Sequence, residues 1–584
     1  MKKSVLLVFS ALAITANAQP VLSSQWAKPL NGAEIPATAA TTIAVTSLGN
    51  VYSTGVFTEE FSFAGEVLEP ITDSSYILKY GTNGNEEWGV VLSGSIAVTS
   101  ATVDEAGNLY VAGQFADEVE FGSTSGSSVI KEGASKEGGF YAEKCAAFIA
   151  KYNASGELQS VVDFVPHTTP DLVTADFEPE GSDIYFRISK IEVANGRVYA
   201  SALYTCETVA AGLTFKGGLY DMEGWGMIFT TVAAGSVFSL DAANLNNGKD
   251  IATFGQIQYG DTQKGSAAVS SMFALSDANV YVAFTGIQDC KLTIGQYSKD
   301  YNFKEARLER VEGSEHPQDP NDPNSDIIYD WKNYPAEVGF VLAAVDASGN
   351  MVSIHDYMGS TSAASCLNYT GGLESAGEYL HMLSTYENEC PFDNAVKAKE
   401  NYNGIAACKI AKSDYAVSNV ATRNSDSATP SYYTISNMAV ADDVIYGAVA
   451  INTTSDGLTA RNVYQTENSA FANIASVIDA PVAVDVNGDR IAFNSINGKA
   501  LTVQSYLNTN SAIDNVISEN TVKVYPNPVV DVLNFSMPVD VTIYSVLGVE
   551  MKHADNVSSI SVSELPAGQY IVKANGNAIH VLKK

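Results

Sequence analysis

The sequence lacks the short motifs that mark common catalytic sites. Its six histidines form no His-Glu-x-x-His pair, and no Gly-x-Ser-x-Gly turn or phosphate-binding glycine loop joins a strand to a helix. The Ser-x-Asp-x-Gly-x-Thr-Trp boxes of sialidases are also missing. We therefore predict no enzyme, no catalytic residue and no resident cofactor. His355 with Asp356, and His381 on a predicted strand, could act as acids or bases, but ordinary structural histidines explain them more simply.

Basic residues are scarce in this chain. There are 33 lysines and arginines against 66 aspartates and glutamates, which gives a formal net charge of -33. An acidic surface repels nucleic acid and anionic lipid. We therefore expect no nucleic acid among the partners.

The one long apolar run is too short to cross a membrane. It extends from Val5 to Ile14, whereas a membrane-spanning helix needs roughly twenty residues. Lys2 and Lys3 precede the run, and small residues follow it up to Ala18, which is the pattern of a secretory signal at residues 1–18 with cleavage before Gln19. No cysteine follows the cleavage site, so a lipoprotein is not expected.

Cysteines are few, and none shows the close spacing of a zinc or redox motif. Three of the six, Cys366, Cys390 and Cys408, lie close together in the sequence. The chain would pass through an oxidising periplasm. One bridge within this group and buried free thiols are both open interpretations.

The body of the chain contains internal repeats. Residues Thr42–Gly55 are echoed by Ala101–Gly113, and Tyr76–Gly84 by Phe148–Gly156. Each segment alternates apolar and polar residues around a turn rich in glycine and asparagine, which predicts paired β-strands. Fainter copies follow, and the equivalent positions are Tyr52, Tyr110, Tyr199, Tyr281, Leu380, Tyr446 and Ala492.

These repeats resemble bacterial β-propeller repeats with a Gly-Asn-x-Tyr strand and a following Ile-x-Lys-Tyr strand. The resemblance implies an all-β fold, a seven-bladed β-propeller over residues 19–507. Spacings longer than the roughly 40–45 residues of one blade predict loop insertions. The segment Ser24–Leu30 resembles Glu87–Ser93, so we predict that it supplies the strand that the last blade lacks. A propeller-like start followed by a β-sandwich is the alternative.

A polar stretch at residues 508–520 is typical of a linker to a second domain at residues 521–584. Six short alternating segments predict a small immunoglobulin-like β-sandwich there. They are Val522–Tyr525, Val532–Phe535, Val541–Ser545, Ser559–Val562, Gln569–Lys573 and Ala578–Leu582.

Four short motifs occur in order within this second domain. The residues that carry them are Pro526, Asn527, Pro528, Leu547, Gly548, Leu565, Gly568, Tyr570, Lys573, Lys583 and Lys584. Together they resemble a type A C-terminal sorting domain of type IX secretion cargo. The resemblance implies a Gram-negative source, the type IX secretion machinery as a partner, and delivery through the periplasm to the outer-membrane surface or the medium. The last two lysines are expected to form an accessible cationic tip.

One polar loop offers oxygen ligands of the type that Ca²⁺ prefers. Its residues are Asp319, Asn321, Asp322, Asn324 and Asp326. The glycine and terminal glutamate of an EF-hand loop are missing, and three prolines explain the stretch as an extended insertion. We therefore expect no cofactor, with a bound calcium ion at this loop as the alternative.

Three functions stay open for the exported chain. The leading hypothesis is a surface or secreted binding or adhesion module for a surface component, a host protein or a glycan. The alternatives are a secreted hydrolase or lyase with its site in the propeller channel, and a structural component of the surface or of vesicles. Carboxylates or histidines with perturbed pKa values at the ring axis would favour the enzyme.

Overall fold

The protein is described from a computed structural model with two compact units, one of residues 22–508 and one that contains residues 524–584. The gaps within the described residues are 31–34, 36–40, 72, 134–143, 167–183, 222–228, 256–266, 288, 303–306, 311–315, 318–326, 329–330, 335–337, 359–367, 388, 391, 398–402, 425–431, 442, 454–456, 468–469, 474–479, 498, 546–548 and 575–576. The predicted signal peptide, its cleavage site at Ala18 and Gln19, and residues 509–520 of the predicted linker lie outside the described residues.

The described residues form strands and no helices, so the prediction of an all-β chain is confirmed. In this part of the chain no helix could span a bilayer.

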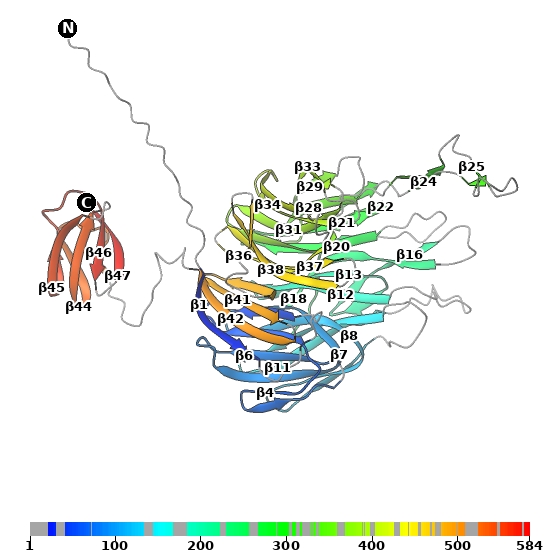
Figure 1. The fold of residues 1–584 in the computed structure, drawn as a ribbon, viewed down its shortest axis with the longest axis horizontal. Helices are drawn as coiled ribbons and strands as arrows, with labels where there is room; N and C mark the ends of the chain where they lie inside the picture. The colour runs from blue at the N-terminus through cyan, green and yellow to red at the C-terminus, as the bar shows by residue number, and fades with distance from the viewer. Residues whose placement is uncertain are drawn as a thin grey trace, which may run out of the picture. The chain divides into compact units, whose positions relative to one another are not determined.

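The larger unit contains seven sets of four antiparallel strands, which we name sheets 1 to 7 (Figure 1). Sheet 1 is β2 (Thr41–Val45), β3 (Val51–Val56), β6 (Ser75–Tyr80) and the first part of β7 (Glu86–Val103). Sheet 2 is the second part of β7, β8 (Leu109–Phe121), β10 (Lys144–Tyr152) and β11 (Leu158–Phe164). Sheet 3 is β12 (Ile184–Ala194), β13 (Arg197–Tyr204), β18 (Ala234–Asp241) and β19 (Lys249–Phe254). Sheet 4 is β20 (Ala267–Leu275), β21 (Asn279–Ile287), β28 (Val338–Asp346) and β29 (Met351–Met358).

The remaining three sheets repeat the same strand order. Sheet 5 is β30 (Asn368–Ala376), β31 (Tyr379–Glu387), β34 (Asn403–Ala411) and β35 (Val417–Asn424). Sheet 6 is β36 (Tyr432–Ala441), β37 (Val444–Thr453), β38 (Gly457–Glu467) and β39 (Ala470–Asn473). Sheet 7 is β40 (Pro481–Asn487), β41 (Arg490–Asn497), β42 (Ala500–Asn508) and, from the other end of the unit, β1 (Leu22–Pro29).

The repeat positions read from the sequence fall at the same place in every sheet. The seven equivalent residues lie on the second strands, which are β3, β8, β13, β21, β31, β37 and β41. The predicted role of the N-terminal segment is also confirmed, because β1 pairs antiparallel with β42 from Leu22 opposite Asn508 to Pro29 opposite Thr502.

Apolar side chains fill the spaces between neighbouring sheets. Between sheets 1 and 2, for example, Tyr52 and Trp88 share one buried cluster with Phe148. Sheets 7 and 1 share a cluster of the same kind, in which Leu501 and Ile43 are buried together. Burial of both faces of a sheet explains the long runs of apolar residues in its inner strands.

Among the described residues, the additional strands form hairpins in the connection between the second and third strands of a sheet. They are β4 (Phe61–Phe63) with β5 (Glu66–Leu68), β9 (Val129–Glu132), β14 (Thr208–Ala210) with β15 (Leu213–Phe215), β16 (Gly218–Asp221) with β17 (Phe229–Val232), β22 (Asp289–Ile294) with β23 (Tyr297–Asn302), β24 (Arg307–Arg310) with β27 (Trp331–Tyr334), β25 (His316–Pro317) with β26 (Ile327–Ile328), and β32 (Glu389–Cys390) with β33 (Asp393–Lys397). In Figure 1, β16, β24 and β25 extend from the same side of the unit.

The C-terminal unit is one five-stranded sheet in its described residues. Its strands are β43 (Val524–Tyr525), β44 (Val532–Ser545), β45 (Glu550–Ser561), β46 (Gly568–Ala574) and β47 (Asn577–Lys583). The prediction of six strands was wrong, because two of the predicted segments form the single strand β44. Register shifts between Asn534 and Val541 bend this strand but keep it paired with β45.

Candidate functional site

The innermost strands of six sheets line a polar cavity of about 360 Å³. Its walls come from β2, β7, β12, β30, β36 and β40. Four charged side chains line it, namely Lys190, Glu192, Glu374 and Asp485. Since inner strands of separate repeats supply these residues, the cavity is the place where distant parts of the sequence meet.

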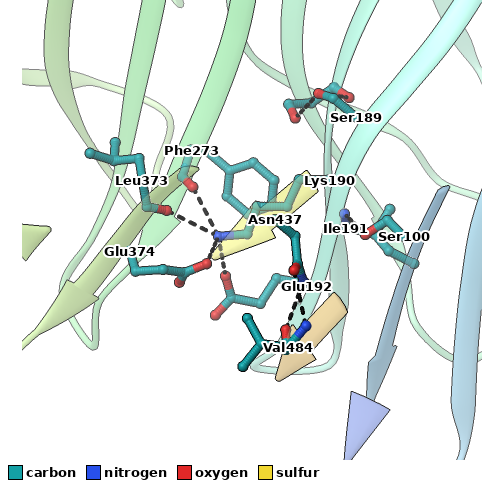
Figure 2. A network of polar contacts seen from close by, with 11 residues as sticks. Ser100, Ser189, Lys190, Ile191, Glu192, Phe273, Leu373, Glu374, Asn437 and Val484 are labelled. Carbon is teal, nitrogen blue, oxygen red and sulfur yellow. Dashed lines mark hydrogen bonds and ion pairs between the residues drawn. The ribbon is translucent and has the colours of Figure 1, made fainter. Parts of the chain in front are cut away.

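Lys190 is the centre of a charged network in this cavity (Figure 2). Its Nζ lies 2.7 Å from Glu374 Oε1 and 3.4 Å from Glu192 Oε2. It also donates to the carbonyl oxygens of Leu373 at 3.1 Å and of Phe273 at 3.2 Å. The lysine of sheet 3 thus bonds directly to sheets 4 and 5.

Backbone groups bind the other polar side chains of the cavity. Asp485 Oδ2 accepts the N–H of Val45 at 2.7 Å, which joins sheet 7 to sheet 1. The Asn437 amide accepts the Val484 N–H at 3.0 Å and donates to the Val484 carbonyl at 2.7 Å, which joins sheet 6 to sheet 7 (Figure 2). These side chains therefore complete hydrogen bonds between sheets.

The charges in the cavity shift one another's pKa values. Burial opposes the charge on Lys190, but Glu374 and Glu192 outweigh it, so the pKa of Lys190 is raised. Burial also raises the pKa of Glu374, against the attraction of Lys190. Burial raises the pKa of Asp485 to about 7, although the bond from the Val45 N–H favours the carboxylate.

The geometry limits what this network can do chemically. An ammonium group has three hydrogens, and Lys190 already contacts two carboxylates and two carbonyl oxygens. It has no hydrogen left to give to a reacting group, and Asp485 is held by the backbone of the neighbouring sheet. The cavity's charged groups are therefore better placed to hold the sheets together than to transfer protons.

The histidine candidates lie away from this cavity. His355 packs against the rings of Tyr357 and Tyr415, with centroids 4.5 Å and 5.6 Å away. Its neighbour Asp356 accepts the hydroxyl of Tyr301 at 2.8 Å and pairs with a lysine. These contacts are packing and hydrogen bonds that involve sheets 4 and 5 and the hairpin strand β23.

His381 is fully buried and joins sheet 5 to sheet 6. Its Nε2 lies 3.1 Å from Asp443 Oδ1, and Lys409 Nζ lies 3.0 Å from the other oxygen of the same carboxylate. Burial lowers the pKa of His381 to about 4, with a smaller opposing effect of Asp443. The side chain is therefore neutral at physiological pH.

The calcium candidates Asp319, Asn321, Asp322, Asn324 and Asp326 lie outside the described residues. In the part of the chain that is described, no group of three acidic, histidine or cysteine side chains is arranged to hold a metal ion.

The described cysteines are all buried. Cys206 and Cys408 are free thiols, so Cys408 takes no part in the predicted bridge. Cys366 lies outside the described residues, and a bridge from it to Cys390 stays a prediction.

The two ends of the sorting motif meet in the C-terminal unit. Asn527 Oδ1 accepts the N–H of Leu582 at 2.9 Å. The Val529 N–H donates to the Leu582 carbonyl at 2.8 Å, and the Lys584 N–H donates to the Val529 carbonyl at 2.9 Å. The segment after Pro526 and Pro528 is thus tied to the last strand of the chain.

The middle of the motif contributes to the core of the same unit. Leu565 is buried there, and the Tyr570 hydroxyl donates to the Pro566 carbonyl at 2.8 Å. Gly568 and Lys573 lie on β46, whereas Leu547 and Gly548 lie outside the described residues.

The expected cationic tip is only half present. Lys583 is 8% exposed and its Nζ donates to the Lys584 carbonyl at 2.7 Å, so the prediction that both terminal lysines are accessible was wrong. The reason is strand alternation, because Val581 and Lys583 face inward on β47 while Leu582 and Lys584 face outward.

Sequence comparison identifies the C-terminal unit. Residues 523–584 match the family model described as a secretion system C-terminal sorting domain. The chain carries a C-terminal sorting domain. This match supports a type IX secretion cargo that is exported to the cell surface or the extracellular space, and it implies an interaction with the type IX machinery. No curated protein matches the chain.

Several solved structures are similar to the chain at very low identity. A protein of unknown function from Dyadobacter fermentans DSM 18053 is 7% identical over 75% of this chain and 99% of its own, with a TM-score of 0.31. Virginiamycin B lyase from Staphylococcus aureus is 10% identical over 70% and 94%, with a TM-score of 0.28. The hemagglutinin-neuraminidase of parainfluenza virus 5 is 8% identical over 77% and 95%, with a TM-score of 0.31.

Proposed function

We propose that residues 22–508 form a closed seven-bladed β-propeller that serves as an exported binding or adhesion module. The closure is supported by β1, which pairs with β42, and by the buried cluster shared by sheets 7 and 1. The bond from the Val45 N–H to Asp485 joins the same two sheets on the cavity side.

One observation carries the binding role. Insertions follow the second strand in five of the seven sheets, and β16, β24 and β25 extend from one side of the unit (Figure 1). Loops on a rigid scaffold are where proteins concentrate ligand contacts. The repeated sheets therefore form the frame, and the inserted hairpins present the binding surface for a host protein, a glycan or another envelope component.

The binding role is tested by removing part of that surface. Residues 288–337 would be replaced with a short turn, and the purified chain would be screened with its parent on glycans and envelope polysaccharides. We expect the parent to bind a ligand that the variant has lost, while far-ultraviolet circular dichroism shows no loss of strand content beyond that of β22 to β27, which the deletion removes. If a ligand bound the parent and the variant equally, its binding site would lie outside residues 288–337.

The export route is tested separately. We propose that residues 1–18 are removed before Gln19 and that residues 521–584 direct passage across the outer membrane. In a host with a type IX system, the full chain should become accessible to added protease on intact cells, and a chain that ends at residue 520 should stay in the periplasm. Surface display of the truncated chain would refute this route.

A secreted hydrolase or lyase is the second candidate, and the raised pKa values of Glu374 and Asp485 favour it. Both carboxylates are bonded to other groups of the protein, which is why we rank it lower. Incubation with polysaccharides, followed by assays for reducing ends and unsaturated products, tests it. Activity that disappears in both Glu374→Gln and Asp485→Asn would establish the enzyme. A structural surface component would instead show self-association without a ligand.

A further inference from the structure

A second pocket, of about 440 Å³, lies between hairpins inserted in sheets 3 and 4. The hairpin β14–β15 lines it together with the hairpin β22–β23, which pairs with β19, the last strand of sheet 3. Residues of β13, β18 and β19 complete the lining. The pocket is therefore built by the same insertions that form the proposed binding surface.

Two lysines make this pocket unusual in an acidic chain. Lys216 follows β15 and Lys291 lies on β22, and both line the pocket. Neither forms an ion pair with any acidic side chain among the described residues. Since acidic residues outnumber basic ones two to one in the whole chain, the pocket offers a local attraction for anions on a surface that otherwise repels them.

A chain of hydrogen-bonded hydroxyl groups links the buried Tyr204 to the lining of the pocket. The buried Tyr204 hydroxyl lies 2.7 Å from Ser236 Oγ, which lies 3.2 Å from Thr253 Oγ1. The Thr253 hydroxyl donates to Asp250 Oδ2 at 3.2 Å. These bonds fix the Asp250 carboxyl at the pocket wall, where it can accept hydroxyl hydrogens from a ligand.

The remaining lining completes a site of sugar size. Tyr297 contributes an aromatic ring that is only half buried, and Ser298 and Gln296 add polar groups to the lining. Ligand sites of about 300–1,000 Å³ commonly combine such a ring with a few fixed polar groups. Lysine donates charge-assisted hydrogen bonds to anionic oxygens.

We propose that this pocket binds an anionic sugar unit, a pyranose that carries a carboxylate or a sulfate, with Lys216 and Lys291 on the anion and Asp250 on the hydroxyls. The proposal rests on the binding role argued above and names the ligand class of that role. A carboxylated or sulfated polysaccharide of the cell envelope or of a host could supply the unit.

Calorimetric titration of the purified full chain tests this site. The probes are a galacturonic acid trimer, its neutral methyl ester, and a sulfated disaccharide with its unsulfated parent. We expect binding of one or both acidic sugars and at least tenfold weaker binding of their neutral counterparts. Lys216→Gln and Lys291→Gln should each weaken binding by about tenfold, as expected for loss of one charge-assisted hydrogen bond. The preferred acidic sugar distinguishes the carboxylate from the sulfate.

Lys249→Gln is the matched control, because Lys249 is exposed on β19 but does not line the pocket. It should leave the affinity unchanged. Equal binding of the neutral sugars, unchanged affinity in both pocket variants, or no binding of any acidic probe would overturn the proposal. If another ligand still bound the inserted hairpins in that case, the binding role would stand while this site would not.

Discussion

Trp26 and Trp88 occupy equivalent positions in two sheets. Trp26 lies in sheet 7, the last sheet, and Trp88 lies in sheet 1, the first. Trp26 lies on β1 and its indole N–H donates to the Thr82 carbonyl at 3.0 Å. Trp88 lies on β7 and donates to the Ala154 carbonyl at the same distance. Each accepting residue is the second of a four-residue turn that ends in a glycine, so β1 relates to sheet 1 as the outer strand of sheet 1 relates to sheet 2.

The glycines that end these turns allow the tryptophans to approach. A Cβ on Gly84 would lie 2.7 Å from the Trp26 ring, and a Cβ on Gly156 would lie 2.7 Å from the Trp88 ring. Both glycines have positive φ, 73° and 84°. Gly84→Ala and Gly156→Ala should therefore suffer backbone strain and a steric clash together.

Gly65→Ala separates the two effects, since Gly65 has φ 85° and a Cβ added there would meet no other atom within 4 Å. We expect about 1 kcal/mol of destabilisation for Gly65→Ala and about 1–3 kcal/mol more for the other two. Urea unfolding followed by tryptophan fluorescence measures this, because all four tryptophans lie before residue 508. Equal losses in all three variants would refute the packing argument.

Removal of β1 tests whether the N-terminal strand completes sheet 7. Deletion of residues 22–30 leaves the edge of β42 unpaired and exposes the cluster around Leu501. We expect a markedly lower melting temperature and a tendency to aggregate through the open edge. Trp26→Ala should retain the pairing but cost about 3 kcal/mol through lost packing. An unchanged melting temperature in the deletion variant would show that the strand is dispensable.

The fold was accessible from the sequence where the repeats kept their turn chemistry. Three sequence features predicted local structure that the sheets repeat. They are the Gly-Asn turns, the positions of Tyr52 and Tyr110, and the likeness between the two tryptophan segments. The C-terminal strand count failed for a local reason as well. Nothing in residues 536–540 distinguishes a bulge within β44 from a turn between two strands, because only pairing with β45 decides it.

The residues that form the charged network of the polar cavity were beyond prediction from sequence. Lys190 and Glu374 are 184 residues apart, and in a chain with 66 acidic residues no pattern marks the two that meet one lysine. The inner strands carry them only because the sheets pack side by side. A lysine close to the apolar residues Ile188 and Ile191 was the available signal in the sequence, and it does not identify the partners of the lysine.

Lys190→Met tests the contribution of this network to stability. The side chains of Lys190, Glu192 and Glu374 are 23%, 33% and 26% exposed, so loss of the cation leaves two partly dehydrated carboxylates without a partner. We expect about 2 kcal/mol of destabilisation, below the 3–5 kcal/mol of a fully buried pair. Lys131→Met is the control, since Lys131 pairs with Asp163 alone near β9 and β11, and it should cost at most about 1 kcal/mol. A smaller loss for Lys190→Met than for the control would contradict a central role.

Asp485 should lower the free energy of unfolding of residues 22–508 as the pH rises. Its pKa is raised to about 7 in the folded chain, above the value of about 3.9 in an unfolded one. The folded state therefore holds the proton more tightly, and this stabilising contribution is present below about pH 4 and lost as the pH rises through 7. Asp485→Asn keeps an acceptor for the Val45 N–H without a charge. The stability of the variant relative to the parent should rise by roughly 1–2 kcal/mol between pH 4.5 and 8, and a constant difference across that range would count against the assignment.

His381 should act in the opposite direction. Its pKa is lowered to about 4 by burial, although Asp443 favours the charged form, whereas an unfolded histidine titrates near 6.5. The unfolded chain therefore binds the proton first, and the stability present above about pH 6.5 is lost as the pH falls towards 4. His381→Gln should remove this loss, which we expect to be on the order of 2–3 kcal/mol. Lys409→Met provides a second check, because Lys409 also lowers the pKa of His381 and its removal should make the acid-induced loss smaller. Urea unfolding of the parent, His381→Gln and Lys409→Met at pH 7, 5.5 and 4.5, followed by tryptophan fluorescence, measures these losses of stability. Parallel pH profiles for the three proteins would rule out His381 as the source of the acid-induced loss.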